Sequence, residues 1–425
     1  MGLGYYTLVR VTDYGPFVTK LILPLPDAAA SAGKTGSWSV FVRRCDSRGN
    51  VLQLPKNWLA RDEREPSMGY CTVRDSYPSE LDGERREKGS CVTLELAYGP
   101  QHALTAEISA PDGVNVYVKS RYTIVQTADM QVGSCAVGGL VYDEKLGTLG
   151  DDAHGFVNEI SHDAEQPLGY GWFAPQTPGD KKPLIVWLHG AGEGGADPTI
   201  AYTGNKVTAM AQKPLQEKFG AGGAYLFVPQ CPTMWMDNGT HEYTRTGQSM
   251  YTRALKSAID EFVSHHADID RTRIYIGGDS NGGFMTMRMV IDYPDFFAAA
   301  FPACEALFDE TISDEQIRRL AKLPIWFIHS KDDPIVSPYE TAVPTYERLK
   351  KAGAANVHFT FWDKVEDIHG AFDQVDGKPF QYIGHFVWIP LYNDDCRLDY
   401  DGSPVLVNGQ EAGVFDWLAA QKRAD

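Results

Sequence analysis

The sequence lacks several features that would assign it directly to a protein class. None of its seven cysteines forms a Cys-x-x-Cys pair, so neither a zinc site nor a small disulfide scaffold is indicated, and no metal or organic cofactor is expected. No apolar run approaches the roughly 20 residues that a membrane-spanning helix needs. The start of the chain has no basic segment followed by an apolar core. We therefore expect a cytoplasmic protein with buried free thiols, or a secreted one whose leader has been removed.

Positive charge is also scarce. The chain has 39 Lys and Arg against 56 Asp and Glu, a net charge of -17. Phosphate-rich partners need clustered cations, so neither nucleic acid nor an anionic membrane is expected as a partner. The densest basic cluster, Arg85, Arg86 and Lys88, alternates with Glu84 and Glu87 and is typical of a solvated loop.

The length and the hydrophobic pattern predict two folded domains. A chain of 425 residues with 43% hydrophobic residues exceeds the usual size of a single core. Residues 1–130 alternate short apolar and polar runs without helical periodicity, which predicts an antiparallel β-sandwich. In residues 131–425, buried strand-like runs alternate with amphipathic helical stretches, which is the pattern of an α/β fold with a mostly parallel sheet flanked by helices.

Specific elements can be assigned within this pattern. Strands are expected in the first domain at residues 5–11, 37–42, 91–96 and 114–118, with an exposed hairpin loop at 81–89. In the second domain, strands are expected at residues 184–188, 225–228, 273–276, 298–301, 325–329 and 357–362. Helices are expected at residues 250–265, 282–293, 314–321, 339–351 and 414–422.

A candidate nucleophile lies between one of these strands and the next helix. The segment contains Gly278-x-Ser280-x-Gly282. A glycine-rich chain can contain this string by chance, but the strand before it and the helix after it favour a nucleophile elbow. In such an elbow a strained turn presents the serine hydroxyl at the N-terminus of a helix, where the helix dipole favours a developing oxyanion.

A glycine-rich loop after an earlier strand is a candidate oxyanion hole. The strand 184–188 runs into His189-Gly-Ala-Gly-Glu-Gly-Gly195, whose main chain can approach a substrate oxygen without side-chain obstruction. We expect the backbone N–H groups of Ala191 and Asn281 to be the donors, with Gly192 in reserve. A phosphate-binding loop is the alternative use of these glycines, but no Gly-Lys-Ser/Thr follows.

The acid and the base must come from later in the chain. Asp332 and Asp333 follow the strand 325–329, and Asp333 is preferred because the Asp-x-x-Val spacing suits the turn expected there. Three histidines are candidates for the base: His358 within a strand, His369, and His385, which follows a glycine and precedes Trp388 by three residues. We favour His385, with His369 as the main alternative. Ser280, Asp333 and His385 then occur in the order Ser, Asp, His.

The chain resembles a known family over this region. The strings Gly169-Tyr-Gly-Trp-Phe-Ala-Pro, Trp187-Leu-His-Gly-Ala-Gly-Glu-Gly-Gly, Gly277-Gly-Asp-Ser-Asn-Gly-Gly-Phe-Met and Gly384-His-Phe-Val-Trp are similar to those of two-domain bacterial α/β-hydrolase esterases, the prolyl-oligopeptidase-like group in which an immunoglobulin-like domain precedes the hydrolase. The resemblance implies a serine carboxylesterase that hydrolyses short-chain acyl esters of small molecules. It places Ser280, Asp333 and His385 at the triad positions, and the extra Asp332 departs from the pattern.

Other roles stay open at this stage. Glu193 and Trp235 are candidate substrate-binding residues, although packing of Trp235 in the core is an equal alternative and such a glutamate is often solvated or paired with Arg. The first domain could bind carbohydrate, shape the active-site entrance or mediate homo-oligomer formation. The alternative functions are a serine peptidase with the same triad and, from a different class, a non-catalytic carbohydrate-binding or adhesion protein.

Overall fold

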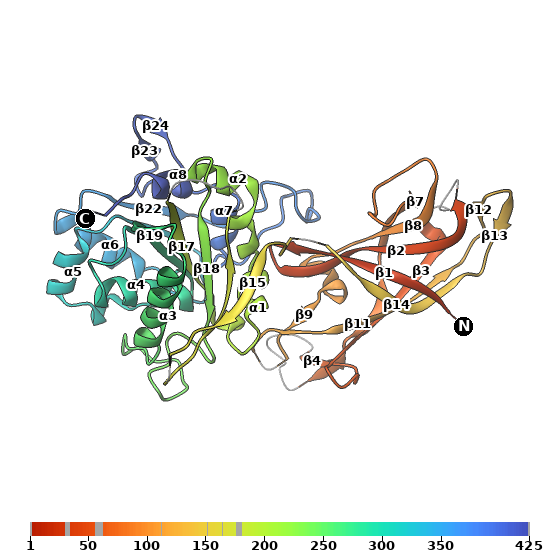
Figure 1. The fold of residues 1–425 in the computed structure, drawn as a ribbon, viewed down its shortest axis with the longest axis horizontal. Helices are drawn as coiled ribbons and strands as arrows, with labels where there is room; N and C mark the ends of the chain where they lie inside the picture. Colours follow the sequence, from red (N-terminus) through yellow and green to blue (C-terminus); the bar gives the residue numbers. More distant parts are fainter. Residues whose placement is uncertain are drawn as a thin grey trace. The chain divides into compact units, whose positions relative to one another are not determined.

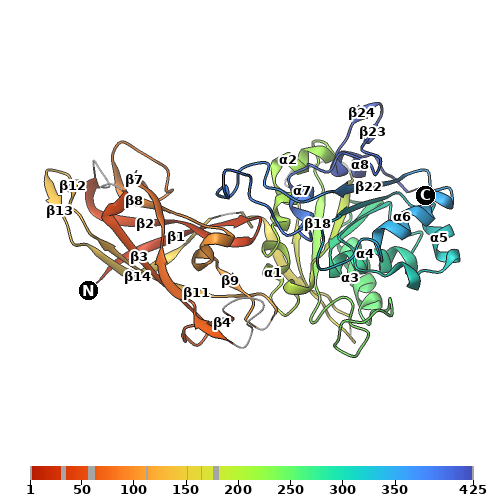
Figure 2. The same cartoon turned by 180° about the vertical axis from the view of Figure 1, so that it is seen from behind.

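The structure is a computed structural model with two compact units, Met1–His154 and Gly155–Asp425 (Figures 1 and 2). It describes residues 2–29, 35–55, 63–111, 113–150, 152–163, 165–175 and 181–423. The seven cysteines are free thiols, of which five are buried, Cys71 is half-buried and Cys135 is exposed. Across the described ranges, no helix combines the length and the apolar character needed to cross a bilayer.

The first unit is all-β. Its main sheet has the strand order β13-β12-β2-β1-β14-β11-β3-β6, and β8 pairs with both β2 and β7. The strands are β1 (Leu3–Thr12), β2 (Gly15–Ala29), β3 (Trp38–Cys45), β4 (Gln53–Pro55), β5 (Arg64–Pro66), β6 (Met68–Cys71), β7 (Val73–Ser79), β8 (Gly89–Leu96), β9 (Ile108–Ser109), β10 (Val116–Tyr117), β11 (Lys119–Gln126), β12 (Met130–Val132), β13 (Cys135–Val137) and β14 (Val141–Leu149).

The alternation of buried and exposed residues along the strands builds the hydrophobic core of this unit. In β11, Tyr122 and Ile124 are buried, whereas Arg121 is exposed and Thr123 and Val125 are only partly covered. They pack in one hydrophobic cluster with side chains of other strands, such as Val40 of β3 and Leu94 of β8. The hairpin predicted at residues 81–89 joins the antiparallel strands β7 and β8, whereas the strand predicted at 114–118 is reduced to the two residues of β10.

The domain boundary differs from the predicted division between residues 130 and 131. Strand β12 (Met130–Val132) spans that point and β13 and β14 lie after it, but all three pair within the first sheet, so this unit extends to His154. The physical reason is that β14 pairs with both β1 and β11. These partners are distant in sequence, and the exposed, charged pattern of β14 does not reveal them.

The second unit contains a sheet in the order β15-β16-β18-β17-β19-β20-β21-β22. The pairs from β18 to β22 are parallel, and only β15 and β16 run antiparallel to their neighbours. Its strands are β15 (Phe156–Ile160), β16 (Gly169–Phe173), β17 (Lys182–Leu188), β18 (Tyr225–Gln230), β19 (Ile269–Asp279), β20 (Ala299–Ala303), β21 (Ile325–Ser330) and β22 (Val357–Trp362), with a small hairpin of β23 (Leu406–Val407) and β24 (Gln410–Glu411).

Helices accompany this sheet. They are α1 (Pro198–Thr203), α2 (Lys213–Gln216), α3 (Thr252–His265), α4 (Asn281–Asp292), α5 (Asp314–Leu320), α6 (Ala342–Lys351), α7 (Trp388–Tyr392) and α8 (Val414–Ala419). Short 3-10 turns include η3 (Ala191–Glu193). The five predicted helices correspond to α3, α4, α5, α6 and α8, and the six predicted strands correspond to β17 to β22. Strands β15 and β16 and helices α1, α2 and α7 were not predicted from the sequence.

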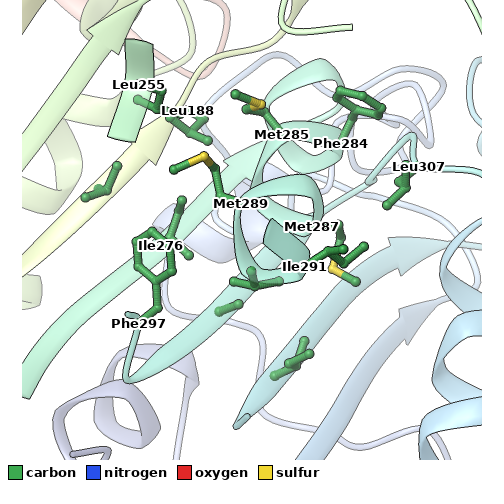
Figure 3. Close-up of a cluster of buried hydrophobic side chains, with 14 of the residues drawn as sticks. Leu188, Leu255, Ile276, Phe284, Met285, Met287, Met289, Ile291, Phe297 and Leu307 are labelled. Carbon is green, nitrogen blue, oxygen red and sulfur yellow. The ribbon is translucent and has the colours of Figure 1, made fainter. Parts of the chain in front are cut away.

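The largest core lies between the sheet and α4. Every residue of α4 from Asn281 to Ile291 is buried, and its methionines pack among side chains such as Leu188, Leu255 and Ile276 (Figure 3). On the opposite face, Trp187 stacks edge-on against Tyr392 of α7, and Trp326 against Trp417 of α8. Helices therefore cover both faces, and the carboxyl ends of the central strands supply the chemically active side chains.

Candidate active site

Ser280 occupies a strained turn between β19 and α4. Its backbone angles are φ 56° and ψ -112°, a conformation that costs a non-glycine residue about 1–3 kcal/mol. The Ser280 N–H donates to the carbonyl of Ala303 at 2.9 Å, and the Ser280 carbonyl accepts the first helical bond from Phe284 at 2.9 Å. The residue is half-buried, so the turn leaves part of it accessible at the carboxyl edge of the sheet.

The flanking glycines allow this turn to form. A Cβ at Gly282 would lie 1.9 Å from the carbonyl oxygen of Leu188, and a Cβ at Gly278 would lie 2.5 Å from the same atom. The backbone of helix α4 therefore packs directly against the backbone of β17, with no side chain between them. Any side chain at either position would push the helix away and displace Ser280.

Asp333 and His385 meet at the same edge. Nδ1 of His385 lies 2.7 Å from Oδ2 of Asp333, and both side chains are almost completely buried. Trp388 packs edge-on behind the ring at 5.6 Å between centroids, as the spacing in the sequence suggested. Because the carboxylate accepts the Nδ1 proton, the neutral ring leaves Nε2 unprotonated and able to accept a proton.

The turn after β21 holds the carboxylate of Asp333 as an anion. Its Oδ1 accepts the N–H groups of Ile335 at 2.8 Å and Val336 at 3.0 Å. Burial alone would raise its pKa, but the hydrogen bonds from His329, His385 and the main chain lower the pKa of Asp333 well below its usual range. An Asp333 that is ionised at neutral pH can orient the His385 ring and stabilise its protonated form.

His329 is a second histidine that contacts this carboxylate, and no role was predicted for it from the sequence. Its Nε2 lies 2.9 Å from Oδ2 of Asp333 and 3.2 Å from the carbonyl oxygen of Val336. Since both neighbours are acceptors, Nε2 carries the proton, and burial lowers the pKa of His329 so that the ring is neutral. The sequence feature that could have identified His329 is its position at the end of β21, four residues before Asp333.

Asp332 has a different environment. Its Oδ1 accepts a hydrogen bond from the Ser330 hydroxyl at 2.6 Å and would lie 2.2 Å from a Cβ placed on Gly384. The loop that carries His385 thus rests directly on the turn that carries Asp332, and only a glycine at position 384 fits there. Asp332 packs against the loop that carries His385, whereas Asp333 is the carboxylate that accepts the hydrogen bond from His385.

The other two histidine candidates belong to separate pairs. His369 is half-exposed and binds Asp395 through Nε2 at 2.9 Å. His358 lies in β22 and binds Asp399 through Nδ1 at 2.7 Å. Neither is hydrogen-bonded to Asp333, so the geometry favours His385 as the base.

The predicted oxyanion donors begin two helical turns. Ala191 is the first residue of η3, and Asn281 is the first residue of α4. The first N–H groups of a helix have no partner within that helix and are therefore suited to bind an oxyanion. Gly192, the reserve donor, lies within η3 and is half-buried.

Side-chain hydrogen bonds fix both donor segments. Nδ1 of His189 lies 2.6 Å from the carbonyl oxygen of Gly190, and its Nε2 accepts the N–H of Cys231 at 2.9 Å. Burial lowers the pKa of His189 to about 4, so the ring is neutral and ties the glycine-rich loop to the loop after β18. Oδ1 of Asn281 accepts the N–H of Trp235 at 2.5 Å and holds that second loop against the start of α4.

The structure corrects two predicted substrate contacts. Trp235 has no exposed surface and belongs to the main hydrophobic core, so it does not line a substrate pocket. Glu193 is buried, with 4% of its surface exposed, because η3 turns its side chain inward. Among the residues that the structure describes, no group of three or more His, Cys, Asp or Glu side chains could hold a metal ion.

Comparison with known proteins finds matches for both units of the chain. Residues 4–134 match the esterase Ig-like N-terminal domain, and residues 175–369 match the phospholipase/carboxylesterase family. A crystal structure of a thermostable esterase has the same fold over 99% of both chains, with a TM-score of 0.73 and 22% sequence identity. The solved structure shares the α/β-hydrolase fold, and both family matches are to domains of carboxylic ester hydrolases.

More particularly, the order of the two matches makes the chain similar to two-domain esterases in which an immunoglobulin-like domain precedes the hydrolase domain. It is 32% identical to poly(3-hydroxyalkanoate) depolymerase C of Paucimonas lemoignei over 129 residues, 28% of this chain and 27% of that protein. It is 25% identical to the putative esterase NocK of Nocardia uniformis subsp. tsuyamanensis over 162 residues, 38% of this chain and 43% of that protein. The chain thus spans less than half the length of both relatives.

Proposed function

We propose that this protein hydrolyses short-chain acyl esters through an acyl-enzyme formed on Ser280. The observation that carries the proposal is the 2.7 Å hydrogen bond from His385 to the buried anion Asp333, at the strand edge where Ser280 is presented by a strained turn. Ser280 follows β19 and Asp333 follows β21, and only β20 separates these strands. The three side chains therefore share one edge of the sheet.

The reaction follows from the protonation states. Nε2 of His385 takes the hydroxyl proton of Ser280 as the oxygen attacks the ester carbonyl, and Asp333 stabilises the imidazolium. The protonated ring then gives its proton to the departing alcohol. Water, activated by the same ring, releases the acid from Ser280.

The main chain stabilises the charge that develops on the substrate. The N–H groups of Ala191 and Asn281 face the oxyanion of both tetrahedral intermediates, and each such donor contributes on the order of 3 kcal/mol to the transition state. Because both donors start helical turns that are fixed by buried hydrogen bonds, they need little reorganisation during the reaction.

Fluorophosphonate labelling tests the nucleophile. The wild-type protein should be labelled at Ser280 and should hydrolyse p-nitrophenyl acetate, whereas Ser280→Ala should lose both properties while keeping its circular dichroism spectrum. A labelled residue other than Ser280, or an active Ser280→Ala variant, would contradict the proposal.

A substrate panel tests the specificity. Short p-nitrophenyl esters should be turned over faster than longer ones and faster than a chromogenic peptide; a preference for the peptide would indicate a peptidase instead. An oligoester of 3-hydroxyalkanoic acid belongs in the panel because one relative is named for depolymerising poly(3-hydroxyalkanoate).

A further inference from the structure

His329 is a buried hydrogen-bond donor beside the triad that the proposed reaction does not use. Its side chain lies at the end of β21 with no exposed surface, and its Nε2 is 2.9 Å from Oδ2 of Asp333. The same oxygen accepts the Nδ1–H of His385 at 2.7 Å. One carboxylate oxygen therefore receives two imidazole N–H groups, and only one of them belongs to the proposed general base.

The turn after β21 closes around the His329 ring. The Nε2–H of His329 also faces the carbonyl oxygen of Val336 at 3.2 Å, and the N–H of Val336 donates to Oδ1 of Asp333 at 3.0 Å. The N–H of Ile335 donates to the same Oδ1 at 2.8 Å. Three of the four hydrogen bonds on this carboxylate thus come from β21 and the turn after it, and they orient the carboxylate without His385.

The charge of the His329 ring suits this arrangement. Burial lowers the pKa of His329, and its Nδ1 has no hydrogen-bond partner among the described residues, so a second proton there would be buried without an acceptor. A cation at position 329 would cancel the charge of Asp333. A neutral N–H instead holds Oδ2 and leaves the negative charge available to stabilise protonated His385.

Two further titratable side chains lie close to this carboxylate. Burial raises the pKa of the Cys304 thiol, which follows β20, and the nearby Asp333 carboxylate raises it further, so the thiol is uncharged at neutral pH. Asp332 accepts the Ser330 hydroxyl through Oδ1 at 2.6 Å. Among the residues that the structure describes, only His329 and His385 donate side-chain hydrogen bonds to Asp333.

We propose that His329 is a positioning residue that holds Oδ2 of Asp333 independently of His385, so that the carboxylate keeps its orientation while the His385 ring gains and loses a proton. This inference rests on the proposed function and adds one residue to the proposed site. Without the His329 donor, Oδ2 would be held by the His385 ring alone, and the ring and the carboxylate could shift together away from Ser280. A misplacement of about 1 Å can lower a rate by about 100-fold.

The test compares His329→Gln with His329→Leu in steady-state hydrolysis of p-nitrophenyl acetate. The glutamine amide can place an N–H close to the position of the histidine Nε2–H, so His329→Gln should keep kcat within about fivefold of the wild type. Leucine has no donor, so His329→Leu should lower kcat by about 30- to 100-fold and change KM by less than about threefold.

His358→Leu is the control, because it removes a histidine of the neighbouring strand that pairs with Asp399, and it should leave kcat within about threefold. Equal kcat in His329→Gln and His329→Leu would overturn the inference, as would a wild-type kcat in His329→Leu. An active Ser280→Ala variant would instead overturn the proposed function, so the two failures are distinguishable.

Proton NMR of the protein, isotope-labelled at histidine, provides a readout that does not depend on turnover or on folding of His329→Leu. The wild type should show a strongly deshielded imidazole N–H signal that is absent from His329→Gln, because this proton lies between two oxygens in a buried site. The same signal should persist at nearly the same chemical shift in His385→Ala, because Oδ2 stays in place. Its loss from His385→Ala would show that His329 does not hold the carboxylate by itself and would refute the inference.

Discussion

At the scale of single residues, the proposed choice between histidines rests on their hydrogen bonds. His385 and His369 both follow the last strand of the main sheet and both pair with an aspartate, but only the partner of His385 is also held by two main-chain N–H groups and a second histidine. Such a fixed anion is what a catalytic base needs behind it.

The first prediction follows from this difference. His385→Ala should lower kcat for p-nitrophenyl acetate by at least about a thousandfold, because it removes the proposed general base that takes the Ser280 proton. His369→Ala should leave kcat within about threefold, because its half-exposed pair with Asp395 is separate. The reverse ranking in steady-state kinetics would assign the base to His369.

Gly384 provides a second test at this scale. Gly384→Ala should lower kcat by about 100-fold, because its Cβ would lie 2.2 Å from Oδ1 of Asp332 and would shift the loop that carries His385 by a fraction of an ångström or more. Gly36→Ala is the control, since its Cβ would meet no atom within 4 Å. Unchanged kcat in Gly384→Ala would show that the two loops can separate without moving the ring.

At the scale of helices and strands, local signals are strong where an element carries its own capping residues. Helix α5 begins with a complete capping box, in which the Ser313 hydroxyl accepts the N–H of Gln316 and the Gln316 side chain accepts the N–H of Ser313. The sequence placed this helix within one residue of its observed end, because its start and stop are both encoded locally.

A third prediction concerns this cap. Ser313→Ala should lower the free energy of unfolding of the second unit by about 1 kcal/mol and leave kcat unchanged, because it removes one hydrogen bond at an exposed helix start. Ser313→Asp should retain most of the stability, since the carboxylate can accept the same N–H. Urea titration followed by circular dichroism measures both, and equal losses in the two variants would contradict a capping role.

Elements defined by distant partners could not be predicted in the same way. Strand β14 is mostly exposed and charged, and its identity depends on pairing with β1 and β11. The motif around Ser280 was recognised because the steric demands of the elbow require glycine at fixed spacing. The role of His329 and the burial of Glu193 and Trp235 depend instead on how segments far apart in sequence pack, which spacing alone does not reveal.

At the scale of the whole molecule, buried carboxyl groups set how stability depends on pH. Asp237 is fully buried and accepts hydrogen bonds from Thr233, Gly239 and His241. Burial raises its pKa, but these bonds lower the pKa overall, from 3.8 to about 2. A carboxyl whose pKa is lower in the folded state stabilises the fold above about pH 4, and this contribution is lost as the pH falls toward 2.

The fourth prediction is therefore a change in acid sensitivity. Asp237→Asn should be less stable than the wild type by about 2 kcal/mol at neutral pH, and the difference should shrink between about pH 4 and pH 2. Urea midpoints at several pH values measure this. A difference that stays constant in acid would show that the loss comes from altered packing and not from ionisation.

Glu305 should act in the opposite direction. Burial raises its pKa from 4.5 to about 8, and its Oε1 has no partner among the described residues, while Oε2 accepts the N–H of Leu307. A carboxyl with a raised folded pKa stabilises the fold below about pH 4.5, and that contribution is lost progressively up to about pH 8.

Glu305→Gln keeps the acceptor for Leu307 and cannot ionise. We expect it to be more stable than the wild type by about 2 kcal/mol above pH 8 and to lose this advantage below about pH 4.5, since an unpaired amide costs about 1–3 kcal/mol. Urea titrations at both pH values measure the crossing, and a variant that is less stable than the wild type at alkaline pH would show that Glu305 ionises without penalty.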